Sequence, residues 1–157
     1  MFGAKSGKPL IRPLAHPGEF RHAVAVRRVV FVQEQACPEE EEFDPWDAAA
    51  THFLVEWDGA FVGTARFFLP LPGVGKIGRV ALLPGVRGRG WGHLLLRAVE
   101  AHAAALAVPE LILDAQVYAL PFYARLGYVA EGPEFLDAGI PHRRMRKRTD
   151  LPPPKTR

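Results

Sequence analysis

A glycine-rich loop with two arginines constrains this chain more than any other feature. The run Lys76–Leu82 has the character of a strand, and Leu94–Glu100 has that of a helix. The segment Arg87–Gly92 lies between them. A loop of this kind brings several backbone N–H groups together at the positive end of a helix dipole. It therefore predicts a phosphate site, with a diphosphate as the expected ligand, to which Arg87 and Arg89 add charge.

The spacing of the glycines excludes two well-known nucleotide loops. Because the glycines are Gly88, Gly90 and Gly92, the G-x-G-x-x-G fingerprint of dinucleotide-binding folds is absent. The P-loop is also absent, since no Gly-Lys-Ser/Thr closes the turn. What remains is the pattern Arg87-x-x-Gly90-x-Gly92 after a strand. The alternative interpretation is a plain glycine turn with solvated arginines.

Length and composition predict one globular domain. The chain has 157 residues, of which 48% are hydrophobic and 24% charged, so it is large enough to bury a core. No apolar run approaches the roughly 20 residues of a membrane span. With one cysteine, Cys37, an internal disulfide is excluded, and no metal-binding motif is present. We expect a cytoplasmic protein without membrane or metal sites, with residues 1–150 as a single domain and 151–157 as a disordered tail.

Charge is distributed unevenly around a net value of +3. Acidic residues cluster between Glu39 and Asp47, and basic residues between Arg143 and Arg148. The basic run is compatible with nucleic-acid binding, but a strand with a basic exposed face is the favoured interpretation. Arg27 falls on the apolar face of a predicted helix. It either extends its charged end to solvent or pairs with an acid, for example Glu34.

Periodicity and turn residues predict an α/β chain with a mixed (α+β) sheet and helices on both faces. A helix is expected from Pro17, a long loop from Glu34 to Ala50, and an Asp58-Gly59 hairpin turn. Two further helices are expected after the glycine loop and around Pro121. The predicted strands are 10–14, 51–57, 60–68, 76–82, 111–116, 128–131 and 142–147.

Three blocks of sequence together resemble the GNAT N-acetyltransferase superfamily, over about residues 10 to 148. The first is the arginine-glycine loop. The second is Leu113–Gln116 followed by Pro121–Tyr128, which is similar to a strand and an FY-x-x-x-GF/Y segment. The third, which resembles the ElaA-like branch, consists of Val30–Gln35, the acidic loop, His52 and Gly139–His142.

The resemblance implies a central, mostly antiparallel sheet whose strands 76–82 and 111–116 splay apart. Acetyl-CoA would lie in this opening as co-substrate, and a backbone N–H of the first strand would bind the thioester carbonyl. The implied cofactor-binding residues are Val80, Ala81, Leu82, Arg87, Gly88, Arg89, Gly90, Trp91, Gly92, Gln116 and Tyr123.

The implied reaction moves an acetyl group to a primary amine of a small molecule, by direct attack in a ternary complex. Tyr123 is the expected general acid, although it could be a packing residue or Tyr118 could take its place. The base that deprotonates the amine is sought among Glu34, Glu42, Asp44 and His52. The acidic loop either attracts a cationic amine or is simply solvated.

Other functions remain open at this stage. They are a non-catalytic acyl-CoA-binding or regulatory module, a protein or peptide N-acetyltransferase, and, less in keeping with the sequence, a nucleic-acid-binding protein. A homodimer is compatible with the sequence. The identity of the acceptor cannot be inferred from the sequence, because acceptor specificity lies on loops, which carry little sequence pattern.

Overall fold

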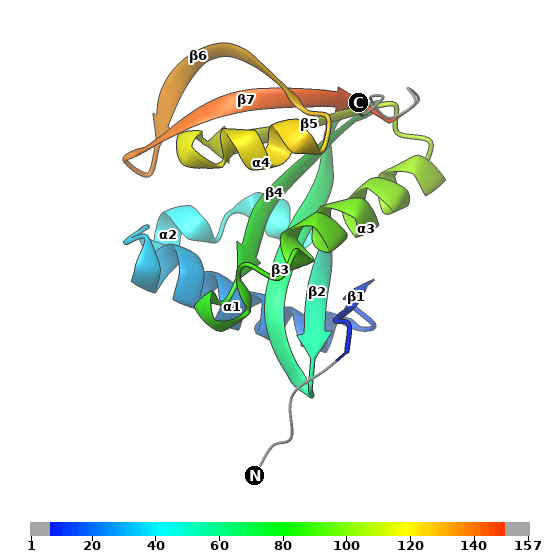
Figure 1. Cartoon of the computed structure of the whole chain (residues 1–157), viewed down its shortest axis with the longest axis vertical. Coiled ribbons are helices and arrows are strands. Elements are labelled where there is room, and N and C mark those ends of the chain that lie inside the picture. Colours follow the sequence, from blue (N-terminus) through cyan, green and yellow to red (C-terminus); the bar gives the residue numbers. More distant parts are fainter. Residues whose placement is uncertain (1–6, 150–157) are drawn as a thin grey trace. The chain divides into compact units, whose positions relative to one another are not determined.

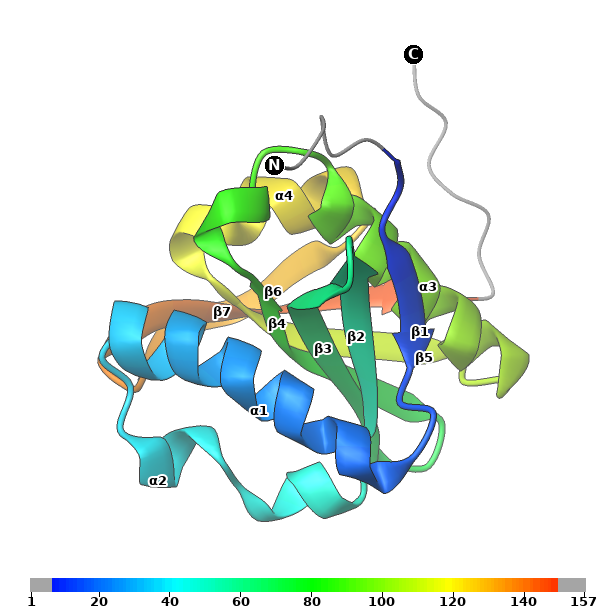
Figure 2. The same cartoon turned by 90° about the horizontal axis from the view of Figure 1, so that it is seen from below.

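The computed structural model describes residues 7–149 (Figures 1 and 2). Its strands are β1 (Leu10–Pro13), β2 (Thr51–Trp57), β3 (Ala60–Leu71), β4 (Val74–Leu82), β5 (Glu110–Gln116), β6 (Val129–Asp137) and β7 (Ile140–Arg148). Its α-helices are α1 (Phe20–Arg27), α2 (Glu39–Glu42), α3 (Trp91–Ala105) and α4 (Leu120–Arg125). Shorter helical segments are η1 (Pro17–Glu19), the π-helix η2 (Arg28–Glu34), η3 (Pro45–Ala48), η4 (Pro84–Val86) and η5 (Val117–Ala119).

The strands form a seven-stranded mixed sheet in the order β1-β2-β3-β4-β5-β7-β6. Strand pairs β1–β2, β5–β7 and β6–β7 are antiparallel, whereas β4 and β5 are parallel. The predicted fold class is therefore confirmed. The parallel register runs from Val74 opposite Glu110 to Ile77 opposite Leu113. The splaying of the two strands beyond this point stays a prediction.

The chain forms two compact units. The first consists of Met1–Arg66 and Arg79–Ala98, and the second of Phe67–Gly78 and Val99–Arg157. Strands β3 and β4 and helix α3 each contribute residues to both units. The single domain over residues 1–150 stays a prediction, and the tail 151–157 lies outside the described residues.

Two hairpins have the same backbone conformation at their turns. Asp58 and Gly59, between β2 and β3, have φ angles of 53° and 76°. Ala138 and Gly139, between β6 and β7, have φ angles of 51° and 77°. Two successive positive φ values are typical of the type I′ turn, whose twist matches that of the flanking strands. The first turn follows from the Asp-Gly signal, whereas the second had not been predicted.

In the first unit, α1 continues directly into the π-helix and packs against β2 (Figure 2). Val26 and Val30 from this long helix cluster with Ala81 of β4, and Phe31 and Leu83 pack against them. The helix predicted from Pro17 is thus confirmed. A π-helix is rare and is often found at functional sites. Here it ends at Glu34.

The expected long loop from Glu34 to Ala50 contains more helix than predicted. Its first residue is the last of the π-helix, and α2 and η3 follow. The Asp44 carboxylate caps η3 by accepting a hydrogen bond from the Trp46 N–H at 3.0 Å. Helical segments of four residues carry too little periodicity to be recognised in the sequence.

In the second unit, α4 lies against β5 and β6 (Figure 1). The core of this unit contains Leu111 and Leu113 of β5, Met145 of β7 and Val99 of α3, each with at most 2% of its surface exposed. Alternate β5 residues Ile112, Asp114 and Gln116 belong to the opposite face of the strand. Among residues 7–149, no helix is both long enough and apolar enough to cross a membrane.

Candidate active site

The glycine loop of the first unit has a left-handed backbone at two positions. Gly88 and Gly90 both have φ near 80°, in the left-handed region that favours glycine. A Cβ atom added at either position would meet no other atom within 4 Å. The open space beside this backbone leaves room for a ligand. Because α3 begins at Trp91, the loop delivers its N–H groups at a helix N-terminus, where an anion is stabilised.

The first loop arginine, Arg87, is bound to a carboxylate. Its two terminal nitrogens donate to the Glu34 oxygens at 2.7 and 2.6 Å, and its Nε donates to the Leu82 carbonyl at 3.0 Å. The hydrogen bond from Arg87 lowers the pKa of Glu34. Two residues that the sequence assigned to different roles, phosphate binding and proton transfer, are therefore in direct contact.

The second loop arginine, Arg89, has a different environment. Its guanidinium carbon lies 4.8 Å from the ring centroid of Trp57 and 5.4 Å from that of Trp91. The two rings meet edge to face, with centroids 5.2 Å apart. Trp57 is the last residue of β2, and no sequence motif had drawn attention to it.

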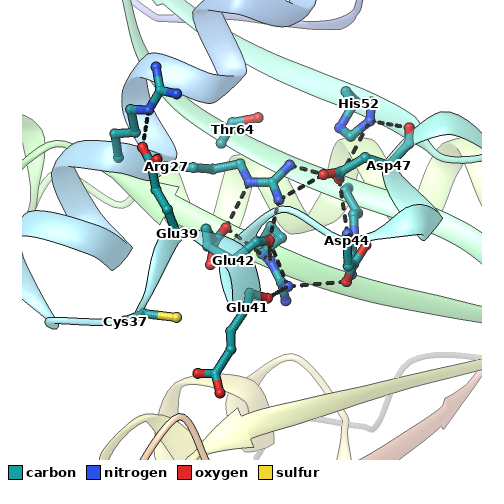
Figure 3. Close-up of polar contacts among 12 residues, drawn as sticks. Arg27, Cys37, Glu39, Glu41, Glu42, Asp44, Asp47, His52 and Thr64 are labelled. Carbon is teal, nitrogen blue, oxygen red and sulfur yellow. Dashed lines mark hydrogen bonds and ion pairs between the residues drawn. The ribbon is translucent and has the colours of Figure 1, made fainter.

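A buried network of charges fixes the acidic segment of the first unit (Figure 3). Arg27, whose side chain is fully buried, donates to Glu42 at 2.8 Å and to Asp47 at 2.8 and 3.1 Å. The expectation that Arg27 extends its charged end to solvent is wrong. The alternative, that it pairs with an acid, is confirmed, although its partners are Glu42 and Asp47 and not Glu34. Burying an arginine is possible only where carboxylates and carbonyl groups satisfy it.

Two further arginines complete this network. Arg66 of β3 contacts Asp44 at 2.7 Å and Asp47 at 2.9 Å. Arg79 of β4 contacts Glu42 at 2.9 Å and Asp44 at 3.2 Å. Three arginines thus face three carboxylates, and the local charge is balanced. The signal that could have indicated this network is the coincidence of Arg27 on an apolar helical face with a nearby run of acids.

The pKa shifts of these acids follow from burial and from the arginines. Burial raises the pKa of Asp47, but hydrogen bonds and charge from Arg27 and Arg66 outweigh it and lower the pKa overall. The pKa of Asp44 is lowered in the same way by Arg66 and Arg79. For Glu42, burial is the largest influence and raises the pKa, against the pull of the arginines.

His52 lies beside this network and is 5% exposed. Its Nε2 lies 2.9 Å from the backbone carbonyl of Asp47, so in neutral histidine this nitrogen carries the proton and donates it. Burial lowers the pKa of His52, which favours the neutral ring. Its Nδ1 has no hydrogen-bond partner among residues 7–149. The catalytic roles of Asp44 and His52 stay predictions.

Arg79 has a second structural role, because it interrupts β4. Its φ angle of 52° is left-handed, inside a strand that runs to Leu82. A left-handed residue breaks the regular pleat and redirects the groups that follow it. Val80, Ala81 and Leu82, where the thioester-binding N–H is expected, come immediately after this break.

In the second unit, the predicted general acid Tyr123 lies on α4. Its ring packs edge to face against Phe122 and Tyr128, with centroids 4.9 and 6.1 Å away. Burial, with a contribution from Tyr118, raises the pKa of Tyr123 well above its usual range. The phenol therefore keeps its proton. The competing candidate, Tyr118, is 78% exposed.

The remaining predicted residue, Gln116, ends β5 opposite His142 of β7. Two residues before Gln116, on the same face of β5, Asp114 binds Arg144 at 2.5 Å and Lys76 at 3.2 Å.

The basic run near the C-terminus lies on β7, as favoured from the sequence. Its members pair with carboxylates or a carbonyl: Arg143 with the Gly132 carbonyl, Arg144 with Asp114, Arg146 with Glu110 and Glu131, Lys147 with Glu100, and Arg148 with Glu110.

Comparisons with known proteins agree with one another. Residues 22–149 match the family described as "Acetyltransferase (GNAT) domain". YjcF of Bacillus subtilis, described as an uncharacterized N-acetyltransferase, is 41% identical over 131 residues, which cover 82% of this chain and 92% of that protein. An acyl-CoA N-acyltransferase structure from Pseudomonas aeruginosa has a TM-score of 0.80 and 30% identity, over 89% of this chain and 99% of its own. ElaA from Escherichia coli shares the fold, with a TM-score of 0.78 and 24% identity over 88% and 99% of the two chains.

Proposed function

Because this chain belongs to the GNAT acetyltransferase family, we propose that it transfers the acetyl group of acetyl-CoA to the primary amine of a small molecule. The family uses acetyl-CoA or another acyl-CoA, and an acyltransferase is what its relatives indicate. The observation that carries the proposal is the loop at the start of α3. Its left-handed glycines, Gly88 and Gly90, leave open space against a helix N-terminus.

The loop residues would hold the diphosphate of CoA. The N–H groups from Gly88 to Gly92 serve as donors, and the arginine side chains supply positive charge. Val80, Ala81 and Leu82 provide the backbone donor for the carbonyl oxygen, where negative charge develops during attack. Gln116 and Tyr123 are two further residues proposed to bind the cofactor.

The chemistry requires three proton transfers. The amine is cationic near neutral pH and must lose a proton before its nitrogen attacks the acetyl carbonyl carbon. As the new C–N bond forms and the C–S bond breaks, the nitrogen loses a second proton and the departing thiolate takes up a proton. Tyr123 is the proposed donor of that proton, because burial keeps its hydroxyl protonated. A phenol with a raised pKa is a weak acid, so its contribution consists largely of a hydrogen bond to the thiolate.

Glu34 is the proposed base, acting directly or through water. Its side chain is 39% exposed, whereas Glu42 and Asp44 are held in the buried arginine network. Glu34 is ionised through its contact with Arg87 and is therefore a weak base. It can take a proton only if the amine is pre-ordered beside it or if Arg87 turns to another anion.

The charge of the acidic segment bears on the choice of acceptor. Glu42, Asp44 and Asp47 are neutralised by buried arginines, and Glu39 pairs with Arg28 at 2.6 Å. Only Glu40 and Glu41 of this segment, which are exposed, therefore remain to attract a cationic acceptor. With so few unpaired acidic side chains, we expect acceptor binding to weaken only modestly as the salt concentration rises.

A thiol-release assay tests the proposal. The protein is given acetyl-CoA and, one at a time, primary amines, polyamines, amino acids and peptides. Amine-dependent release of free thiol, with the acetylated small molecule detected by mass spectrometry, supports it. Release with peptides alone would assign the alternative of a peptide N-acetyltransferase.

A further inference from the structure

The two arginines of the glycine loop are held in opposite ways. Arg87 gives its N–H groups to Glu34 and to the Leu82 carbonyl. Arg89 forms no ion pair or hydrogen bond with any residue between 7 and 149, and within this range its guanidinium lies against the rings of Trp57 and Trp91. The positive charge of Arg87 is thus offset by a carboxylate, whereas no carboxylate within residues 7–149 pairs with Arg89.

A cation over an aromatic face remains able to bind an anion. The attraction comes from the electron-rich face of the ring and uses none of the five N–H donors of the guanidinium. Those donors form a planar fork that matches two phosphate oxygens. Contact with two rings also restricts the side chain before any ligand arrives, so less rotamer freedom is lost on binding.

The position of this cluster fits a phosphate ligand. Arg89 lies between the two left-handed glycines, and Trp91 is the first residue of α3. Trp57 comes from a different element, the end of β2, just before the Asp58-Gly59 turn. Through its contacts with Arg89 and Trp91, the ring of Trp57 therefore packs the β2–β3 hairpin against the glycine loop.

We propose that Trp57 is a positioning residue for CoA: together with Trp91 it holds Arg89 beside the glycine loop, where the guanidinium binds a phosphate of CoA. The proposal rests on the proposed function, because it requires that CoA binds this loop. It assigns the phosphate-binding charge to Arg89, and to Arg87 a bracing contact between Glu34 and the end of β4.

A double-mutant cycle tests this assignment. Calorimetry measures CoA affinity for the wild type, Trp57→Leu, Arg89→Met and the double variant. Trp57→Leu is expected to raise the Kd about three- to tenfold. Arg89→Met is expected to raise it by at least as much, and adding Trp57→Leu to Arg89→Met should cause no further loss. The loss in Trp57→Leu should also shrink at high salt, since it reflects a charged contact.

Matched variants separate positioning from general stability. Trp57→Phe keeps an aromatic face and should change the Kd by less than about twofold. Trp46→Leu removes an exposed tryptophan of η3 from the same unit and should leave CoA affinity unchanged. Arg89→Lys leaves both rings in place but lacks the planar fork, so it should weaken binding about as much as Trp57→Leu. This last variant gives a result even if Trp57→Leu does not fold.

The outcomes are distinguishable. A wild-type protein that does not bind CoA overturns the proposed function, and this inference with it. A wild type that binds CoA, with Trp57→Leu or Arg89→Lys of equal affinity, overturns this inference alone. An equal further loss when Trp57→Leu is added to Arg89→Met also overturns it, because Trp57 would then act independently of Arg89.

Discussion

Glu34 and Arg87 form a two-point ion pair, with nitrogen–oxygen distances of 2.7 and 2.6 Å, across 53 positions of sequence. The pair joins the end of the π-helix to the start of the glycine loop. The Glu34 carboxylate therefore binds Arg87, which lies beside the proposed diphosphate site. Both side chains are about two-fifths exposed, so the pair is weak enough to open.

Glu34→Gln should affect CoA binding and turnover in opposite directions. Removing a negative charge beside the loop is expected to lower the Kd for CoA by up to about fivefold. Loss of the proposed base should reduce kcat by at least about a hundredfold. Glu39→Gln, which removes an exposed carboxylate paired with Arg28, is the control and should change neither value. A weaker CoA complex would show that the contact of Glu34 with Arg87 matters more for CoA binding than the negative charge of Glu34, and an unchanged kcat would remove Glu34 as the base.

Gly90→Ala tests the conformation of the loop. A side chain at a φ of 80° costs about 1–2 kcal/mol in stability, and its Cβ would enter the open space proposed for the diphosphate. We expect the Kd for CoA, measured by calorimetry, to rise more than about tenfold. Gly85→Ala is the control, because that residue also faces open space but has no positive φ. Equal CoA affinity in both variants would place the diphosphate elsewhere.

Arg27→Met tests whether the buried network holds the first unit together. Removing the arginine takes away the fully buried partner of Glu42 and Asp47, which keep only Arg79 and Arg66, and the loss of one partner of a buried ion pair costs about 3–5 kcal/mol. The neighbouring Arg28, whose ion pair is half exposed, provides the control. Arg28→Met should change the free energy of unfolding by less than about 0.5 kcal/mol. Urea unfolding measures both, and similar stabilities would contradict a structural role for Arg27.

The stability contributed by His52 should depend on pH. Because burial lowers its pKa in the folded protein, the folded state binds this proton less readily than the unfolded state. The contribution is therefore complete above the unfolded pKa of about 6.5 and is lost as the pH falls from there toward the folded pKa. The stability difference between wild type and His52→Phe should narrow between about pH 7.5 and pH 5. A difference that is constant or widens on acidification would mean that the pKa is not lowered.

Features encoded by neighbouring residues were predictable, and features that depend on distant partners were not. The Asp58-Gly59 turn and the loop before α3 follow from glycine positions, because only a few residues tolerate positive φ. Arg27 was recognised as unusual, yet its partners lie 15 and 20 positions away and depend on how the chain folds back. The left-handed conformation of Arg79 has no sequence signal, since arginine rarely adopts it. The contact of Trp57 with Arg89 likewise depends on the placement of β2 beside the loop.

The most direct test of the account is amine-dependent thiol release from acetyl-CoA by wild type and Tyr123→Phe, with CoA affinity measured on both proteins. The substitution keeps the aromatic packing against Phe122 and Tyr128 and removes the hydroxyl alone. We predict turnover by the wild type, a fall in kcat of about ten- to a thousandfold in the variant, and an unchanged Kd for CoA. Wild-type kcat in Tyr123→Phe would show that this tyrosine is structural. A wild type that binds CoA but releases no thiol with any amine would contradict the proposed acetyl transfer itself.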